Sequence, residues 1–269
     1  MQVGRAALHT WEEPPLSGTH GSGTVFFSHC SLQCVYCQNM VLSRGKAGQS
    51  LSVARLAEIF CELQQQGAHN INLVTPTHYV PAIIEALQRA RAMGLHLPIV
   101  YNTSGYELPE TIELLDGFVD IFLTDFKYWD NDIAKTWSNA PNYREYALAA
   151  LEAMLHITGI PTYSNSEIMQ RGTMVRHLLL PGRLEDSCRI AEELHVRFGS
   201  DITLSLMGQY TPCHQIEQFP QLNERTDQTN YEALLDFADS LGIENYFWQE
   251  EGAAEESFIP RFDGTGTKA

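Results

Sequence analysis

Residues 24–37 read TVFFSHCSLQCVYC. The stretch opens with β-branched and aromatic residues, which favour a buried strand over 24–27. Cys30, Cys34 and Cys37 follow directly, with three and then two residues between them. We therefore expect a strand whose carboxyl end carries a short loop with three thiol groups.

Outward from this stretch, short apolar runs alternate with amphipathic segments. Apolar residues recur at three- and four-residue steps from Ser52 to Gly67, which predicts a helix there. The other predicted strands are 71–74, 97–101, 119–124, 174–180, 202–207 and 245–248, and the other predicted helices are 81–94, 108–115, 132–157, 184–198 and 231–241. Such alternation indicates an α/β fold with a parallel sheet, either doubly wound or curled into a full or partial barrel. In these folds ligands bind where the strands end.

The chain has 269 residues and 30.3 kDa, which one domain can accommodate. Residues 1–22 are rich in Pro and Gly and read as an irregular N-terminal arm. The barrel is expected over 23–250. Residues 251–269 are expected to form a C-terminal tail, and the pairs Glu250-Glu251 and Glu255-Glu256 read as solvated acidic residues.

Charge and hydropathy exclude two classes of partner. Seventeen Lys and Arg against 33 Asp and Glu give a formal charge of −16, which repels a nucleic-acid backbone. No segment approaches the roughly 20 apolar residues that a membrane-spanning helix needs. We therefore expect a cytoplasmic protein without nucleic-acid or membrane partners. In that reducing compartment, cysteines more often bind metal or do chemistry than form disulfides.

The number of thiols in the loop bears on the metal. Structural zinc takes four protein ligands, whereas three thiolates can hold three corners of an iron–sulfur cubane and leave one iron open. A zinc site that recruits His29, Cys61, Cys188 or Cys213 as fourth ligand is the alternative. Cys61 and Cys188 fall in predicted helices, where a packed, small apolar residue is the default. Cys213 reads as a plain loop thiol.

The CxxxCxxC spacing after the first strand resembles the signature of the radical S-adenosylmethionine (SAM) superfamily. Further motifs are similar to the uncharacterised group of that superfamily related to pyruvate formate-lyase activating enzymes. They are Trp11-Glu12-Glu13-Pro14, Ser17-Gly18-Thr19, Gly21-Ser22-Gly23-Thr24, Cys37-Gln38-Asn39 and Asn72-Leu73-Val74-Thr75-Pro76-Thr77-His78-Tyr79. The resemblance implies a partial (β/α)6 barrel of the TIM type, with one [4Fe-4S] cluster on Cys30, Cys34 and Cys37.

The resemblance also implies an activity and partners. It implies an oxidoreductase that cleaves SAM to a 5'-deoxyadenosyl radical and abstracts hydrogen, as an activating enzyme does from a glycyl residue of a partner enzyme. The expected partners are a protein or peptide substrate and a low-potential electron donor such as flavodoxin or ferredoxin. A noncatalytic metal-binding or iron–sulfur sensing protein is the rival interpretation.

Polar residues near the predicted strand ends are the expected SAM contacts. By position, Tyr36 is expected to pack by the adenine. The remaining expected contacts are Thr75, Thr77, Asn102, Ser104, Asp125, Lys127, Arg176 and Gln209. Asp125 and Lys127 alternate along one strand and so share a face, where they either pair with each other or meet SAM. Tyr36 can also be a loop aromatic, Thr75 and Thr77 part of a simple turn, and Arg176 and Gln209 surface or packing residues.

Two departures from the family pattern affect function. Activating enzymes hold the SAM amino group with a Gly-Gly-Glu type motif after the second strand, where this chain has Thr75-Pro76-Thr77. Related proteins often carry a further cysteine-containing segment ahead of the Trp-Glu-Glu-Pro stretch. The sequence here begins almost at that stretch, so we expect a short or an incomplete form.

Overall fold

A curved sheet of parallel strands organises the computed structural model, which describes residues 1–248 and 260–268. Seven of its described strands run parallel, each hydrogen-bonded to the next. In sheet order they are β2 (Ser22–Phe27), β4 (Ile71–Val74), β5 (Ile99–Thr103), β6 (Ile121–Asp125), β8 (Met169–Leu178), β9 (Thr203–Met207) and β10 (Tyr246–Trp248). All seven were predicted, and the α/β partial barrel is confirmed.

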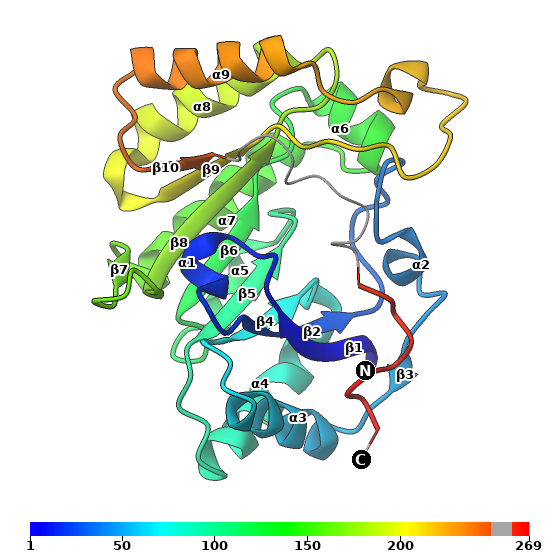
Figure 1. Cartoon of the computed structure of the whole chain (residues 1–269), viewed down its shortest axis with the longest axis vertical. Helices are drawn as coiled ribbons and strands as arrows, with labels where there is room; N and C mark the ends of the chain where they lie inside the picture. Colours follow the sequence, from blue (N-terminus) through cyan, green and yellow to red (C-terminus); the bar gives the residue numbers. More distant parts are fainter. Residues whose placement is uncertain (249–259, 269) are drawn as a thin grey trace.

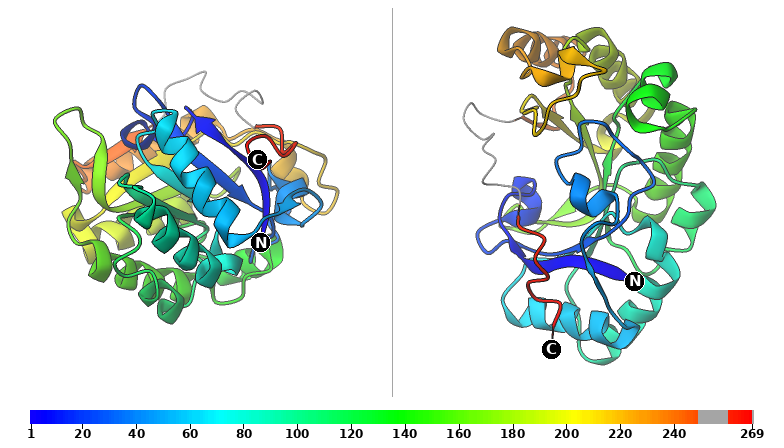
Figure 2. Two further views of the ribbon diagram at one scale, coloured as in Figure 1. Left: turned by 90° about the horizontal axis from the view of Figure 1, so that it is seen from below. Right: turned by 90° about the vertical axis from the view of Figure 1, so that its right-hand side faces the viewer.

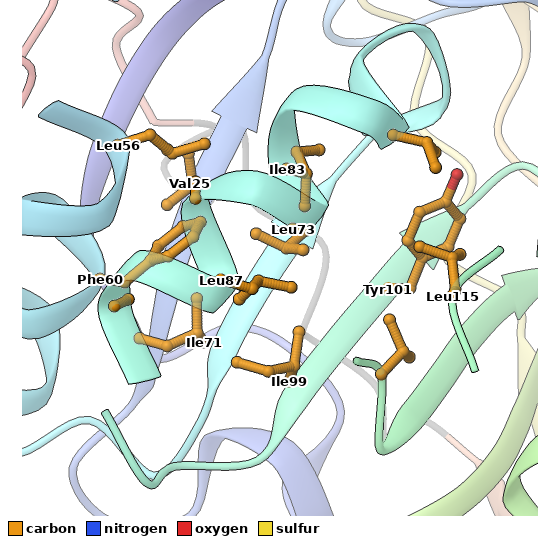
Figure 3. Close-up of a cluster of buried hydrophobic side chains, with 14 of the residues drawn as sticks. Val25, Leu56, Phe60, Ile71, Leu73, Ile83, Leu87, Ile99, Tyr101 and Leu115 are labelled. Atoms are coloured by element: carbon orange, nitrogen blue, oxygen red, sulfur yellow. The ribbon is translucent and has the colours of Figure 1, made fainter. Parts of the chain in front are cut away.

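Helices cover the outer side of this sheet (Figures 1 and 2). They are α3 (Val53–Gln65), α4 (Val80–Ala92), α5 (Pro109–Glu113), α6 (Asn131–Ser138), α7 (Tyr143–Thr158), α8 (Leu184–Phe198) and α9 (Gln228–Ser240). α3 begins where the Ser52 hydroxyl accepts a hydrogen bond from the Arg55 amide. Its apolar face, including Leu56 and Phe60, packs with α4 onto outward-facing residues of β2, β4 and β5 (Figure 3).

A separate, smaller apolar cluster fills part of the inner side of the sheet. Its buried members are Leu16, Val100, Ile121, Leu123, Met169 and Met174. Val100 and Tyr101 are neighbours on β5, yet Tyr101 packs in the outer cluster, because successive strand residues point to opposite faces. Leu16 comes from the short helix α1 (Pro14–Ser17) and is fully buried. α1 therefore packs an apolar side chain against the inner side of the sheet.

The N-terminal segment differs from the prediction. Residues 2–9 of the expected irregular arm form β1 (Gln2–His9), which pairs antiparallel with β2 and with the short β3 (Gln49–Ser50). Buried and exposed residues do not alternate cleanly along β1, so its sequence lacks the alternation typical of a half-buried strand. The strand forms because it pairs with β2 and β3.

The single helix predicted over 132–157 is divided into two helices. Asn139 and Asn142, both in the left-handed region, break it between α6 and α7.

The last described residues lie along β1. The Ala6 amide donates to the Thr265 carbonyl over 2.9 Å, and the Gly264 amide donates to the Gly4 carbonyl over 3.0 Å. Figure 2 shows this red segment beside β1. The acidic pairs at 250–251 and 255–256 lie outside the described residues. No helix in the described part of the chain is long and apolar enough to cross a membrane.

Candidate functional site

The cysteine loop follows β2 and is held by backbone hydrogen bonds from two sides. The short helix α2 (Met40–Ser43) accepts on one side, where Cys30 N donates to Ser43 O over 3.0 Å. On the other side the end of α6 accepts, since Gln33 N donates to Ser138 O over 3.0 Å and Val35 N to Trp137 O over 2.8 Å. Leu32 anchors the loop in the core. These contacts fix the loop where the parallel strands end.

The three thiols of this loop are partly buried and free of disulfides. Burial raises the pKa of Cys30 to about 12. Burial also raises the pKa of Cys34, while the charge of Lys127 and a hydrogen bond from Ser138 oppose that rise. Without metal, Cys30 and Cys34 therefore keep their protons at neutral pH, and a metal must displace those protons to bind these two sulfurs.

The donor set fits three corners of an iron–sulfur cubane. Across residues 1–248 and 260–268, no three His, Cys, Asp or Glu side chains converge on a single metal ion. In a cubane each thiolate binds a different iron, so the sulfurs need not converge on one point. His29, the nearest alternative ligand for zinc, places Nε2 3.1 Å from Oε1 of Gln2. The loop thus offers sulfur from three cysteines, while one of the two ring nitrogens of His29 is bound to Gln2.

Tyr36 contacts one tyrosine through its hydroxyl and another through its ring. Its hydroxyl lies 2.5 Å from that of Tyr128. Its ring meets the edge of Tyr210 at a centroid distance of 5.9 Å. Burial raises the pKa of Tyr36 well above its usual value, so the phenol is neutral. The adenine contact of Tyr36 stays a prediction, and its hydroxyl is already bound within the protein.

Charged side chains from the ends of two strands, a polar side chain from a third and a carboxylate from the N-terminal segment meet on the inner face. Lys127 Nζ lies 2.6 Å from Asp125 Oδ2, so these two residues pair with each other. Arg176 Nε donates to Asp125 Oδ1 over 2.9 Å, and its Nη2 donates to Asn102 Oδ1 over 2.9 Å. Burial alone would raise the pKa of Asp125, but Arg176 and Lys127 outweigh it and lower the pKa. Asp125 is therefore ionised.

Glu12 and Glu13 complete this charged group, although neither was predicted as a site residue. Arg176 Nη1 lies 3.3 Å from Glu12 Oε2, and Asn102 Nδ2 lies 3.4 Å from Glu12 Oε1. Glu13 is buried, which raises its pKa. In the sequence, the only sign of this role is the position of the two glutamates directly before the apolar Leu16. Because Leu16 packs against the inner side of the sheet, the residues just before it lie close to the inner side as well.

The residues after β4 and β5 form a second polar group. Thr75 has φ +57°, a strained value for a β-branched residue, and its amide donates to the Asn102 carbonyl over 2.9 Å. Thr77 Oγ1 donates to Glu107 over 2.6 Å, and Thr103 Oγ1 donates to the same oxygen over 2.6 Å. Glu107 is buried and was also missed from sequence. The Thr77 hydroxyl is thus committed to Glu107.

Ser104 and Gln209 are the remaining predicted positions. The Ser104 carbonyl accepts a hydrogen bond from the Tyr143 hydroxyl over 2.7 Å, and Gln209 is half-buried in the loop after β9. Asn72 is fully buried on β4 and neither atom of its amide has a protein partner. Cys61 is partly buried in the apolar cluster of α3 and α4, and Cys188 of α8 is partly buried in a second apolar cluster that also contains Leu32, as predicted for packed helix residues. Cys213 is exposed.

Sequence comparison points to one family. Residues 24–194 match the profile of the Radical SAM superfamily, which is more than half of the chain. An uncharacterised protein of Methanocaldococcus jannaschii, MJ0674, is 25% identical in an alignment of 246 positions that covers 88% of this chain and 67% of that protein.

Solved structures share the fold. A radical SAM methyltransferase from Sphaerobacter thermophilus aligns over 86% of this chain and 67% of its own, with a TM-score of 0.56 and 16% identity. SuiB of Streptococcus suis, solved bound to the precursor peptide SuiA, aligns over 86% of this chain and 48% of its own, with a TM-score of 0.54 and 11% identity. At these identities the likeness extends to the fold alone.

Proposed function

This chain belongs to the radical SAM superfamily, and on that premise we propose that it holds one [4Fe-4S] cluster on Cys30, Cys34 and Cys37 and cleaves SAM reductively. The observation that supports the proposal most is the three-thiol loop, fixed from two sides beside the charged strand ends. When bound, the cluster supplies the single electron that splits SAM into methionine and a 5'-deoxyadenosyl radical.

The chain's own residues bind and orient SAM. Asp125, Lys127 and Arg176 face the interior at the ends of β6 and β8 and offer both signs of charge to the amino and carboxylate groups of SAM. Thr75, Asn102 and Ser104 present polar atoms after β4 and β5. Tyr36 and Gln209 are the proposed neighbours of the adenine and ribose. The Thr77 hydroxyl is bound to Glu107, so any contact of Thr77 with SAM is left to its other atoms.

The proposed substrate is a protein or peptide, from which the radical removes a hydrogen atom. The products are then 5'-deoxyadenosine and a substrate radical. The peptide bound to the structurally similar SuiB supports this class. A glycyl residue of a partner enzyme, as in pyruvate formate-lyase activation, is the finer proposal, with flavodoxin or ferredoxin as electron donor.

The test is SAM cleavage after anaerobic reconstitution with iron and sulfide. Reduction with dithionite in the presence of SAM is expected to yield methionine and 5'-deoxyadenosine, and the Cys34→Ala variant is expected to yield neither. Absence of 5'-deoxyadenosine from a wild-type protein with a reduced cluster would contradict the proposal. Stoichiometric zinc without iron in anaerobically purified protein would contradict it as well.

The glycyl proposal has its own measurement. Extract from cells grown on glycine deuterated at the α-carbon is mixed with the reduced enzyme and unlabelled SAM. Abstraction from a glycyl residue transfers one deuterium, which raises the mass of 5'-deoxyadenosine by about one unit. Unlabelled 5'-deoxyadenosine that forms only when extract is present would place the abstracted hydrogen elsewhere.

A further inference from the structure

A chain of three hydroxyl groups leads from Tyr36 to a sulfur of the same loop. The hydroxyl of Tyr36 lies 2.5 Å from that of Tyr128, which lies 2.5 Å from Ser138 Oγ. Ser138 Oγ lies 3.0 Å from Cys34 Sγ. Tyr128 and Ser138 are buried, with 1% and 0% of their surface exposed. We call Tyr36, Tyr128 and Ser138 the hydroxyl relay.

The proton count of the relay fixes its direction once Cys34 is a thiolate. A thiolate accepts hydrogen bonds and cannot donate, so the single Ser138 proton points to Sγ. Ser138 Oγ must then accept from Tyr128, and Tyr128 must accept from Tyr36, because each hydroxyl has one proton. All three dipoles therefore point toward Cys34. Hydrogen bonds aligned in this way strengthen one another.

The fold holds Ser138 rigidly. Ser138 is the last residue of α6, a helix whose first turn is capped by the Asp130 side chain and whose C-cap is Asn139 with φ +53°. The Ser138 carbonyl also accepts from the Gln33 amide within the cysteine loop. Ser138 thus binds the loop backbone with its carbonyl and the Cys34 sulfur with its hydroxyl. These two contacts hold the hydroxyl in a fixed position relative to the cysteine loop.

From this geometry we infer that the hydroxyl relay tunes the reduction potential of the cluster through Cys34. The inference rests on the proposed function, since it needs a cluster on that thiolate. One-electron reduction adds a negative charge to the cluster and its sulfurs. A donor to a ligand sulfur stabilises the more negative state and raises the potential. Burial of the same sulfur works in the opposite direction, so the relay offsets part of the cost of placing charge there.

The test is an electron-paramagnetic-resonance redox titration of reconstituted variants without SAM. Ser138→Ala removes the hydroxyl that donates to Cys34. Tyr128→Phe removes the hydroxyl that donates to Ser138, and Tyr36→Phe removes the hydroxyl that donates to Tyr128. We expect midpoint potentials more negative than wild type, with the shift largest for Ser138→Ala and smallest for Tyr36→Phe. Ser22→Ala is the matched control. Ser22 is fully buried and donates to Asn70, but it lies at the opposite end of β2 from the cysteines.

The outcomes separate the two proposals. A wild-type protein that assembles no iron–sulfur cluster overturns both the proposed function and the relay. Ser138→Ala and Tyr128→Phe with full iron and sulfide and wild-type potentials overturn the relay alone, as do positive shifts. If Ser138→Ala binds no cluster, Tyr128→Phe decides, since it keeps the Ser138 donor and must still shift the potential negatively.

Discussion

Arg176 and Asp125 stand opposite each other on the neighbouring parallel strands β8 and β6, and their side chains are joined by a 2.9 Å hydrogen bond. The same guanidinium reaches Glu12 and Asn102. Arg176 is therefore the residue that connects the N-terminal segment to two strand ends. Its planar group with several donors suits that arrangement better than an ammonium group does.

Removal of Arg176 is expected to destabilise the fold. Arg176→Ala leaves Glu12 without its cation and Asp125 with Lys127 alone, and breaking a buried ion pair costs about 3–5 kcal/mol. Arg176→Lys is expected to recover only part of this. Denaturant unfolding measures both, with Arg189→Ala as control because its partner Glu185 is on the surface. Equal losses for Arg176→Ala and Arg189→Ala would show that the buried network contributes no more than a surface pair.

Alanine at each loop cysteine is expected to remove the cluster and leave the barrel folded, because a loop and not a core holds the iron. Iron and sulfide content and visible absorbance should fall to background in Cys30→Ala, Cys34→Ala and Cys37→Ala, while far-ultraviolet circular dichroism stays that of wild type. Cys61→Ala, Cys188→Ala and Cys213→Ala are the matched controls and should keep full iron. Global unfolding of the loop variants would instead indicate a structural metal.

Leu16→Ala tests how much the packing of α1 against the inner face stabilises the barrel. Leu16 is 0% exposed among the buried residues of β5, β6 and β8, so truncation leaves a cavity. The expected loss of unfolding free energy is about 2–5 kcal/mol. Leu108→Ala removes the same atoms from a residue that is 52% exposed and should change stability by about 0.5 kcal/mol or less. A similar small change in both variants would mean that α1 is dispensable for the barrel.

Glu107 makes stability depend on pH. Burial raises its pKa in the folded protein, with hydrogen bonds from Thr103, Thr77 and Tyr101 opposing the rise. The folded state therefore binds this proton more tightly than the unfolded state, and the stability gained is lost as pH rises through the folded pKa. Glu107→Gln removes this titration. We expect the variant to gain unfolding free energy relative to wild type as pH rises above the usual carboxyl range.

Denaturant unfolding at several pH values measures that difference. Glu110→Gln, which removes an exposed carboxylate nearby, controls for the change in net charge. A Glu107→Gln variant whose stability relative to wild type falls as pH rises would show that the carboxylate form is the one the fold prefers.

The barrel was predictable because most of its strands contain a short apolar run that is bounded by breakers and followed by helical periodicity. Ile71–Val74 and Thr203–Met207 are examples, and both lie within one residue of their predicted bounds. β8 is the exception in its bounds, since it begins at Met169, five residues before the predicted start at Met174. β1 was not predictable in this way. Its burial does not alternate cleanly, and it exists as a strand because β2 and β3 supply its hydrogen bonds.

The candidate site likewise contains residues that local sequence patterns predicted and residues that they did not. The cysteine loop was visible because its three ligands are close in sequence, and the shared face of Asp125 and Lys127 followed from strand alternation. Glu12 and Ser138 were missed because each meets its partner across a long stretch of chain, as Ser138 and Cys34 do across 104 positions. Glu107 binds Thr103 only four positions away, but it also binds Thr77 from the loop after another strand, and that contact depends on the sheet. Local pattern contains no information on such pairs, which only the packed barrel brings together.

The apolar filling around Leu16 also bears on where a charged ligand can sit. A charged group among these buried side chains would lose its hydration without gaining polar partners, which is costly. The filling therefore favours a charged ligand at the strand ends, where Asp125 and Arg176 lie.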